Sequence, residues 1–312
     1  MNRREFLSSA GSMASLVAAA GTTGLWAART PRAPQYYYDP ARLLRAGVSS
    51  RSFRNFFAST REKTFRLPGP MITLLDFPGI ISDRYQVHHL EFASPHFATT
   101  EPEYLAQLRK AIGRARSRLV NIPVKTREIT MGAGLSDHDP SVRDAAVAAV
   151  KKWIDVAHDI RSDSVSADPG SINGADISPT LDSYRKLSAY GRLRRVDVLI
   201  ENHQGAEPGE IIDIVRQVGG RTLGALPDFS NFPNPAARAR GLELLFPRAL
   251  TVCHAKGISF DGQGNETTFD FKQCVDISRR SHFRGIYSVE FAGPGDPYQG
   301  VQHVINELIR YL

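Results

Sequence analysis

The sequence predicts an α/β fold, a single-domain (β/α)₈ TIM barrel that spans residues 46–312. Short apolar runs alternate with amphipathic stretches, which is typical of a parallel sheet with crossover helices. Eight such units follow one another at intervals of about 30 to 45 residues, and eight units favour closure into a barrel. A doubly wound open sheet is the alternative, but it would need a Gly-rich phosphate loop after its first strand, where residues 49–52 read SSRS.

The first half of the chain contains four expected strands and three expected helices. Apolar residues at Leu105, Leu108 and Ile112 recur at helical spacing, and the helix over 141–160 begins after Asp139 and Pro140. A helix over 71–85 is expected to break at its internal Pro-Gly pair. The expected strands are 46–53, 87–92, 118–124 and 163–167, and the expected helices are 71–85, 101–115 and 141–160.

The second half repeats this alternation with clearer boundaries. Gly219 and Gly220 end one helix, as glycines do where the backbone must leave the helical conformation. The expected strands are 196–201, 222–228, 249–254 and 285–290, and the expected helices are 180–190, 208–218, 236–246, 269–280 and 298–311.

Composition is ordinary for a globular protein: of 312 residues, 42% are hydrophobic and 23% charged, with a formal net charge of +7. No dense Lys/Arg block with interleaved aromatics is present, which disfavours nucleic acid as a partner. The two cysteines, Cys253 and Cys274, fit either a disulfide in an oxidising compartment or two buried thiols. Oligomeric state is left open, and a homo-oligomer is compatible with the sequence.

The N-terminus predicts export. Residues 2–7 read NRREFL, which matches the twin-arginine pattern, and an Ala/Gly/Ser-rich stretch follows to about Trp26. We assign 1–28 to a signal peptide, with cleavage after Ala20 or Ala27, and 29–45 to a lead-in segment. Ser, Thr and Gly interrupt the apolar run, so no stable membrane anchor is expected. The expected location is periplasmic or secreted.

Polar side chains end four consecutive expected strands. They are Glu201, Asp228, His254 and Glu290. In a barrel the carboxyl ends of neighbouring strands surround one point, so these groups are expected to converge. Three carboxylates and one imidazole suit Mn²⁺, Mg²⁺ or Co²⁺, with Zn²⁺ less favoured. Taken singly, each residue has a structural alternative. Glu201 fits a salt bridge at the rim of the barrel, and Asp228 fits a cap of the following helix. His254 fits a buried core histidine, and Glu290 fits an ion pair with an arginine such as Arg51.

The residues around these positions carry a family resemblance. The chain resembles the xylose isomerase-like TIM-barrel superfamily, the sugar phosphate isomerase/epimerase group, over nearly all of its length after the signal. The matching segments are 90–91 (LE), 200–203 (IENH), 227–232 (PDFSNF), 254–256 (HAK), 261–265 (DGQGN) and 289–296 (VEFAGPGD).

The resemblance implies that Glu201, Asp228, His254 and Glu290 hold a divalent metal, most readily Mn²⁺. It also implies that Glu201 and Glu290 act as an acid/base pair. Such a pair suits the removal and return of a proton next to a sugar carbonyl. The related endonuclease branch needs several additional histidines, and their absence argues against DNA repair.

Five further residues are candidates for substrate contact. Lys256, two positions after His254, is expected to face the same side and to offset oxyanion charge, although a surface lysine is the alternative. His203, Asn231, Glu91 and His96 are expected to contact a sugar. Asn231 stands where related epimerases often carry a histidine, which departs from the usual ketose epimerase pattern.

These features predict a metal-dependent sugar isomerase or epimerase that works through an enediolate. An exported, non-catalytic sugar-binding barrel is one alternative. A metal-dependent lyase or hydrolase acting on a glycoside or ketoglycoside is the other.

Overall fold

The computed structural model describes residues 39–65, 69–172, 174–203 and 206–312, all of which belong to one compact unit. The expected signal peptide over 1–28 lies outside the described residues, and so does the lead-in segment up to residue 38. Within the described residues, no helix is both long enough and apolar enough to cross a membrane.

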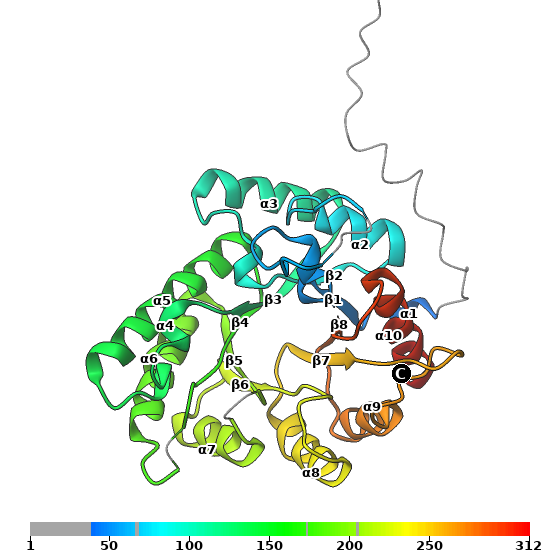
Figure 1. Ribbon diagram of the computed structural model, residues 1–312. Helices are drawn as coiled ribbons and strands as arrows, with labels where there is room; N and C mark the ends of the chain where they lie inside the picture. The colour runs from blue at the N-terminus through cyan, green and yellow to red at the C-terminus, as the bar shows by residue number, and fades with distance from the viewer. Residues whose placement is uncertain (1–38, 66–68, 173, 204–205) are drawn as a thin grey trace, which may run out of the picture. The chain divides into compact units, whose positions relative to one another are not determined.

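The described residues form an eight-stranded parallel sheet with the order β6-β5-β4-β3-β2-β1-β8-β7. Two parallel bridges, Ala225 to Ala249 and Asp228 to His254, join β6 to β7 and close the sheet into the predicted (β/α)₈ barrel. Figure 1 shows the strands as an inner ring. The strands are β1 Ala46–Ser49, β2 His89–Glu91, β3 Arg118–Val124, β4 Ser164–Ala167, β5 Asp197–Glu201, β6 Leu223–Leu226, β7 Val252–Gly257 and β8 Ile286–Phe291.

Helices surround this ring (Figure 1). Most begin with a proline in the first turn, where its missing N–H costs no hydrogen bond, and side chains such as Asp139 cap several of them. The α-helices are α1 Pro40–Leu43, α2 Phe77–Tyr85, α3 Pro102–Arg114, α4 Arg127–Thr130, α5 Pro140–Ile160, α6 Ser178–Arg194, α7 Pro208–Val218, α8 Pro235–Leu245, α9 Phe271–Arg280 and α10 Pro297–Tyr311. The 3₁₀ helices are η2 Ser50–Phe56, η3 Ser94–His96, η4 Gly134–Ser136 and η5 Phe246–Arg248.

Several expected elements differ from the structure in their bounds, and three of these differences have a clear cause. The first strand ends at Ser49 because the chain turns into η2 there, with the Ser49 hydroxyl accepting a hydrogen bond from Arg51 N. The helix expected over 71–85 starts only at Phe77, so Pro78 lies in its first turn and breaks nothing. Strand β7 is displaced toward the C-terminus, to 252–257, because it pairs with β8 along its whole length.

An apolar layer fills the inside of the barrel. Val120, Leu199, Leu226 and Val252 pack together, and all four are almost fully buried. Polar groups from the same strands lie one or two residues further toward the carboxyl ends, so this apolar layer lies directly beneath them. Cys253 and Cys274 are both free and buried, so the expectation of two buried thiols is confirmed and the disulfide is wrong.

Candidate metal centre

Four of the predicted side chains meet at the carboxyl end of the barrel. Alternation along the strands turns Glu201, at the end of β5, and His254, inside β7, toward the interior. Asp228 follows β6 and forms a bridge with His254, while Glu290 lies near the end of β8. Ligand atoms of Glu201, Asp228 and His254 lie within 4.8 Å of one another, and so do those of Glu91, His254 and Glu290.

His254 lies between carboxylates on both sides of its ring. Its Nδ1 is 3.2 Å from Glu201 Oε1 and 3.5 Å from Asp228 Oδ2, and its Nε2 is 3.1 Å from Glu91 Oε2. Burial alone would lower the pKa of His254, but the charges of Glu91 and Glu201 raise it well above its usual value. Without a metal the imidazole is therefore a cation held by these carboxylates.

Lys256 reaches into the same cluster, as predicted from its spacing to His254. Its Nζ is 2.6 Å from Asp228 Oδ2 and 3.7 Å from Glu290 Oε1, and only 11% of the side chain is exposed. Burial acts to lower the pKa of Lys256, yet the Asp228 and Glu290 charges raise it above its usual value. The surface-lysine alternative is thus wrong, because the ammonium lies between two buried carboxylates.

The cluster carries more negative than positive charge. Burial would raise the pKa of Asp228, but the Lys256 ammonium and His254 hold it far below its usual range. The four carboxylates of the cluster, those of Glu91, Glu201, Asp228 and Glu290, share three cationic partners: His254, Lys256 and, at the more exposed edge, Arg51 at 3.9 Å from Glu290. The buried site therefore holds more carboxylates than cations, and a divalent cation would offset this excess.

The donor set fits such a cation. Asp228 Oδ2 is fully buried and has no well-directed hydrogen bond within the described residues, although Lys256 approaches it as an ion pair. Glu201, Asp228 and Glu290 offer oxygen and His254 Nδ1 offers nitrogen, a mixture that suits Mn²⁺, Mg²⁺, Co²⁺ or Zn²⁺. The Lys256 ammonium pairs with two of these carboxylates, Asp228 and Glu290, so it would compete with a metal for them.

Two amides hold Asp228 and Glu91 in position. Neither was assigned a role from the sequence, although Asn202 lies in the matching segment 200–203. Asn202 Oδ1 accepts a hydrogen bond from Asp228 N at 2.7 Å, and Asn202 Nδ2 donates to Asp228 O at 3.2 Å. Asn121 Nδ2 donates to Glu91 Oε2 at 3.0 Å. Each contact joins residues that lie in, or directly after, different strands, and a sequence pattern carries no sign of such a contact.

Glu91 has a different position from the one expected for a sugar contact. Its carboxylate is fully buried between Asn121 and His254, so its surroundings are those of a group that orients the imidazole. A carboxylate that binds the second nitrogen of a ligating histidine fixes the ring orientation and its protonation. Asn231, by contrast, does lie at the centre: its Nδ2 donates to Glu201 Oε1 at 3.3 Å, and its Oδ1 accepts from Lys256 at 3.5 Å.

His203 lies beside this centre and contacts a separate group. Its Nδ1 is 3.3 Å from Asp168 Oδ2, and the same carboxylate pairs with Lys125. Glu290, in turn, lies 3.9 Å from Arg51 Nε, so the arginine pair considered from the sequence exists alongside the cluster.

His96 is separate from the centre and is built into the core. Its Nδ1 is 2.8 Å from Ser50 Oγ, its Nε2 is 3.0 Å from Thr60 Oγ1, and its ring stacks on Phe57 at a centroid distance of 3.9 Å. With both nitrogens satisfied and 5% of the residue exposed, this geometry gives His96 a structural role and lends no support to a sugar contact.

The neutral His96 predicts a loss of stability in acid. Burial lowers its pKa to about 3, so the unfolded chain takes up the proton first as the pH falls. The stability that comes from burying His96 in its neutral form is complete above pH ~6.5 and is lost between there and pH ~3, by up to roughly 5 kcal/mol. Denaturant unfolding between pH 7 and pH 4 should show a smaller loss in His96→Gln than in the unmodified protein. The exposed His282→Asn control should keep the original slope, and equal slopes in all three proteins would contradict the assignment.

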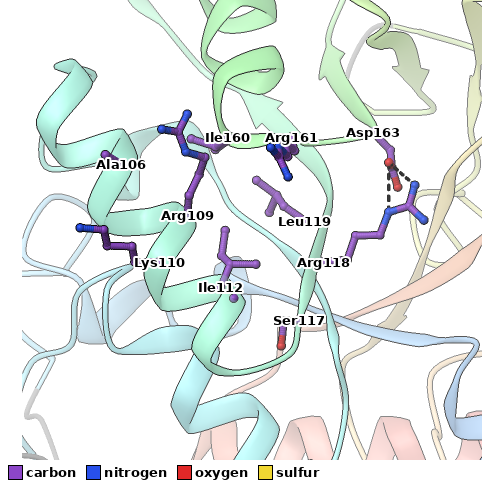
Figure 2. Close-up of a pocket in the computed structure, with 11 residues that line it drawn as sticks. Ala106, Arg109, Lys110, Ile112, Ser117, Arg118, Leu119, Ile160, Arg161 and Asp163 are labelled. Carbon is purple, nitrogen blue, oxygen red and sulfur yellow. Dashed lines mark hydrogen bonds and ion pairs between the residues drawn. The ribbon is translucent and has the colours of Figure 1, made fainter.

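A pocket of about 600 Å³ lies at the opposite end of the barrel, where α3 and α5 end (Figure 2). Four of its lining residues are basic, but Arg118 pairs with Asp163, and Arg109 donates to Asp159 O in the last turn of α5. Cations at helix C-termini offset the helix dipole, and this face of a barrel contributes to stability. The clustered carboxylates and His254 lie at the carboxyl ends of the strands, so we place the candidate site there.

Comparisons with known proteins agree with this architecture. The sequence profile of the xylose isomerase-like TIM barrel matches residues 85–311. A search of curated proteins finds no significant match. Among solved structures, a D-tagatose 3-epimerase-like protein is similar at TM-score 0.63 and 16% identity, covering 85% of this chain and 97% of that one.

Two similar structures contain metal ions. A xylose isomerase-like TIM-barrel protein from Mycobacterium smegmatis, in complex with magnesium, aligns at TM-score 0.59 and 13% identity, over 86% of this chain and 98% of that one. The IOLI protein with a bound zinc atom aligns at TM-score 0.65 and 12% identity, over 86% and 99%. At these identities the likeness concerns the fold, and the profile match over most of the chain shows that it belongs to the xylose isomerase-like TIM-barrel family.

Proposed function

We propose that this protein is a divalent-metal-dependent sugar isomerase or epimerase that moves a proton on the carbon next to a carbonyl. The observation that carries the proposal is the convergence of Glu201, Asp228, His254 and Glu290 at the carboxyl end of the barrel. The similar structures include an epimerase-like protein and proteins that contain magnesium or zinc. We place Mn²⁺ first among the candidate metals because the donor set is mostly oxygen with one imidazole.

The glutamates supply the proton chemistry. Glu201 contacts Asn231 and Glu290 contacts Lys256, so the two carboxylates flank the Asn231–Lys256 pair from β5 and β8. One carboxylate removes the proton from carbon, and the electron pair moves onto the carbonyl oxygen to give an enediolate. For epimerisation the other glutamate starts protonated, so it gives its own proton to carbon while the first glutamate keeps the one it removed. Transfer to the opposite face inverts that carbon. Transfer to the neighbouring carbon exchanges aldose and ketose, with the hydroxyl proton of the carbon that was deprotonated passing to the former carbonyl oxygen.

The remaining groups bind and orient the substrate. Lys256 offers N–H donors to oxygen that becomes negative, at a site with little exposed surface. Asn231 offers an amide to a hydroxyl, and His254 is held in place by Glu91. A divalent cation, when bound by Glu201, Asp228, His254 and Glu290, would polarise the carbonyl and adjacent hydroxyl oxygens. We also propose that the protein acts outside the cytoplasm after twin-arginine export.

One observation favours a different function, that of a non-catalytic sugar-binding barrel. The Lys256 ammonium partly balances the carboxylates without any metal. Proton exchange separates the two functions. The protein is titrated with Mn²⁺ and incubated in deuterated water with a panel of ketoses and aldoses. We expect deuterium to enter the position next to the carbonyl, detected by NMR, only when protein and metal are both present. Binding without exchange would favour the binding barrel.

A further inference from the structure

A second group of charged residues lies at the same end of the barrel, next to the candidate metal centre. Lys125 follows β3, Asp168 follows β4 and His203 follows β5, three strands that are neighbours in the sheet. Lys125 Nζ pairs with Asp168 Oδ2, and His203 Nδ1 is 3.3 Å from the same oxygen. We call Lys125, Asp168 and His203 the rim triad. His203 N also donates to Glu201 O at 2.9 Å, so the triad adjoins the metal centre directly.

The backbone that carries the rim triad is fixed by buried hydrogen bonds. Tyr184 donates to Ala167 O at 2.7 Å and Ser136 donates to Pro169 O at 2.8 Å, on either side of Asp168. Gly170 has φ +82 and lies too close to the carbonyl of Ala133 for any side chain.

Lys125 is held in the same manner. Its N–H donates to Ser94 Oγ at 2.8 Å. A charged pair on the rim of a barrel does not need such support to contribute a salt bridge. Fixed positions of this kind are what a binding site needs, because less ordering is left to occur when a ligand arrives.

The triad has unused hydrogen-bonding capacity. Its side chains are partly exposed: 26% for Lys125, 18% for Asp168 and 31% for His203. An ammonium has three N–H donors and a carboxylate about four acceptor positions, so Lys125 has donors beyond its ion pair, and Asp168 has acceptor positions beyond its contacts with Lys125 and His203. Burial raises the pKa of Asp168, but His203 and Lys125 lower it to about 2. Lys125 and Asp168 are therefore oppositely charged and balance each other at neutral pH.

The opposite charges of Lys125 and Asp168 indicate which kind of ligand the rim triad can bind. A phosphate needs cations that are not already neutralised, whereas a row of hydroxyl groups needs donors and acceptors side by side. We propose that the rim triad is a subsite for hydroxyl groups at the far end of an unphosphorylated polyhydroxy substrate. The placement of the carbonyl end at the metal centre rests on the proposed function, whereas the recognition of hydroxyl groups does not.

Equilibrium binding tests this inference. The full-length protein, with and without Mn²⁺, is titrated calorimetrically with erythritol, xylitol, sorbitol, D-fructose and D-fructose 6-phosphate. We expect at least one unphosphorylated compound to bind more tightly than the phosphate ester. Lys125→Met and Asp168→Asn should each weaken that binding at least tenfold. The double variant leaves no unpaired charge, so it should fold even where a single variant does not, and it should also bind at least tenfold more weakly.

Lys186→Met is the matched control, because Lys186 pairs with Asp144 at 2.9 Å on the outer helices, away from the rim. It should bind the polyol as the unmodified protein does. Unchanged affinity in the double variant, preference for the phosphate ester, or no binding of any compound would each overturn the inference. If a polyol binds in a way that depends on the triad but no proton exchange is detected, the subsite is supported and the proposed reaction is overturned.

Discussion

Glu290→Gln should reduce proton exchange at least 1,000-fold. Glu290 projects inward from β8, with its Oε1 3.7 Å from Lys256 Nζ and 3.9 Å from Arg51 Nε. The amide has nearly the same shape and keeps a carbonyl oxygen for these cations, but it cannot accept or return a proton. General acid–base groups typically contribute 10²–10⁴-fold, and loss of one metal ligand adds to this. The rate of deuterium incorporation at saturating Mn²⁺ and substrate measures the effect.

The same substitution at Glu243 is the control, because that side chain is exposed on α8 and touches no part of the centre. Glu243→Gln should exchange at the original rate. Circular dichroism and thermal unfolding should show that Glu290→Gln keeps the barrel. An intact Glu290→Gln protein that still exchanges within tenfold of the original rate would remove Glu290 from the proton chemistry.

Elements with strong local signals could be predicted closely from the sequence. Strand β3 over 118–124 and helix α7 over 208–218 have the expected boundaries. Strand β3 is a short run that is buried almost throughout, and α7 has helical periodicity and ends at Gly219. The convergence of Glu201, Asp228, His254 and Glu290 follows from the same logic, since a parallel barrel brings the ends of successive strands together.

Contacts between distant strands could not be predicted in this way. Glu91 and His254 are 163 residues apart, and their contact depends on the register of β2 and β7 across the barrel. The rim triad likewise depends on three loop conformations, and the Asp168 loop is shaped by hydrogen bonds from η4 and α6. η4 was not expected from the sequence because its three residues, Gly134–Ser136, have no hydrophobic periodicity. The structural role of His96 depends on Thr60 and Ser50, neither of which carries a sequence signal.

Lys256→Met should destabilise the metal-free protein and strengthen its binding of Mn²⁺. Lys256 Nζ lies 2.6 Å from Asp228 Oδ2, and Asp228 is fully buried. Methionine keeps most of the side-chain volume but leaves the Asp228 and Glu290 carboxylates without this cation. Breaking a buried ion pair from one side costs about 3–5 kcal/mol, so the Tm of the metal-free protein should fall by roughly 10 °C.

A divalent cation supplies the lost charge, and in the variant it displaces no ammonium. Mn²⁺ should therefore bind at least tenfold more tightly to Lys256→Met than to the unmodified protein, and saturating Mn²⁺ should restore most of the lost Tm. Calorimetric titration and thermal unfolding measure both effects, and neither needs a substrate. Lys186→Met should change neither the Mn²⁺ affinity nor the gain in Tm on its addition. Weaker Mn²⁺ binding in Lys256→Met would mean that the ammonium supports the metal site. If metal-free Lys256→Met has the same Tm as the unmodified protein, the ammonium does not stabilise the buried Asp228 carboxylate.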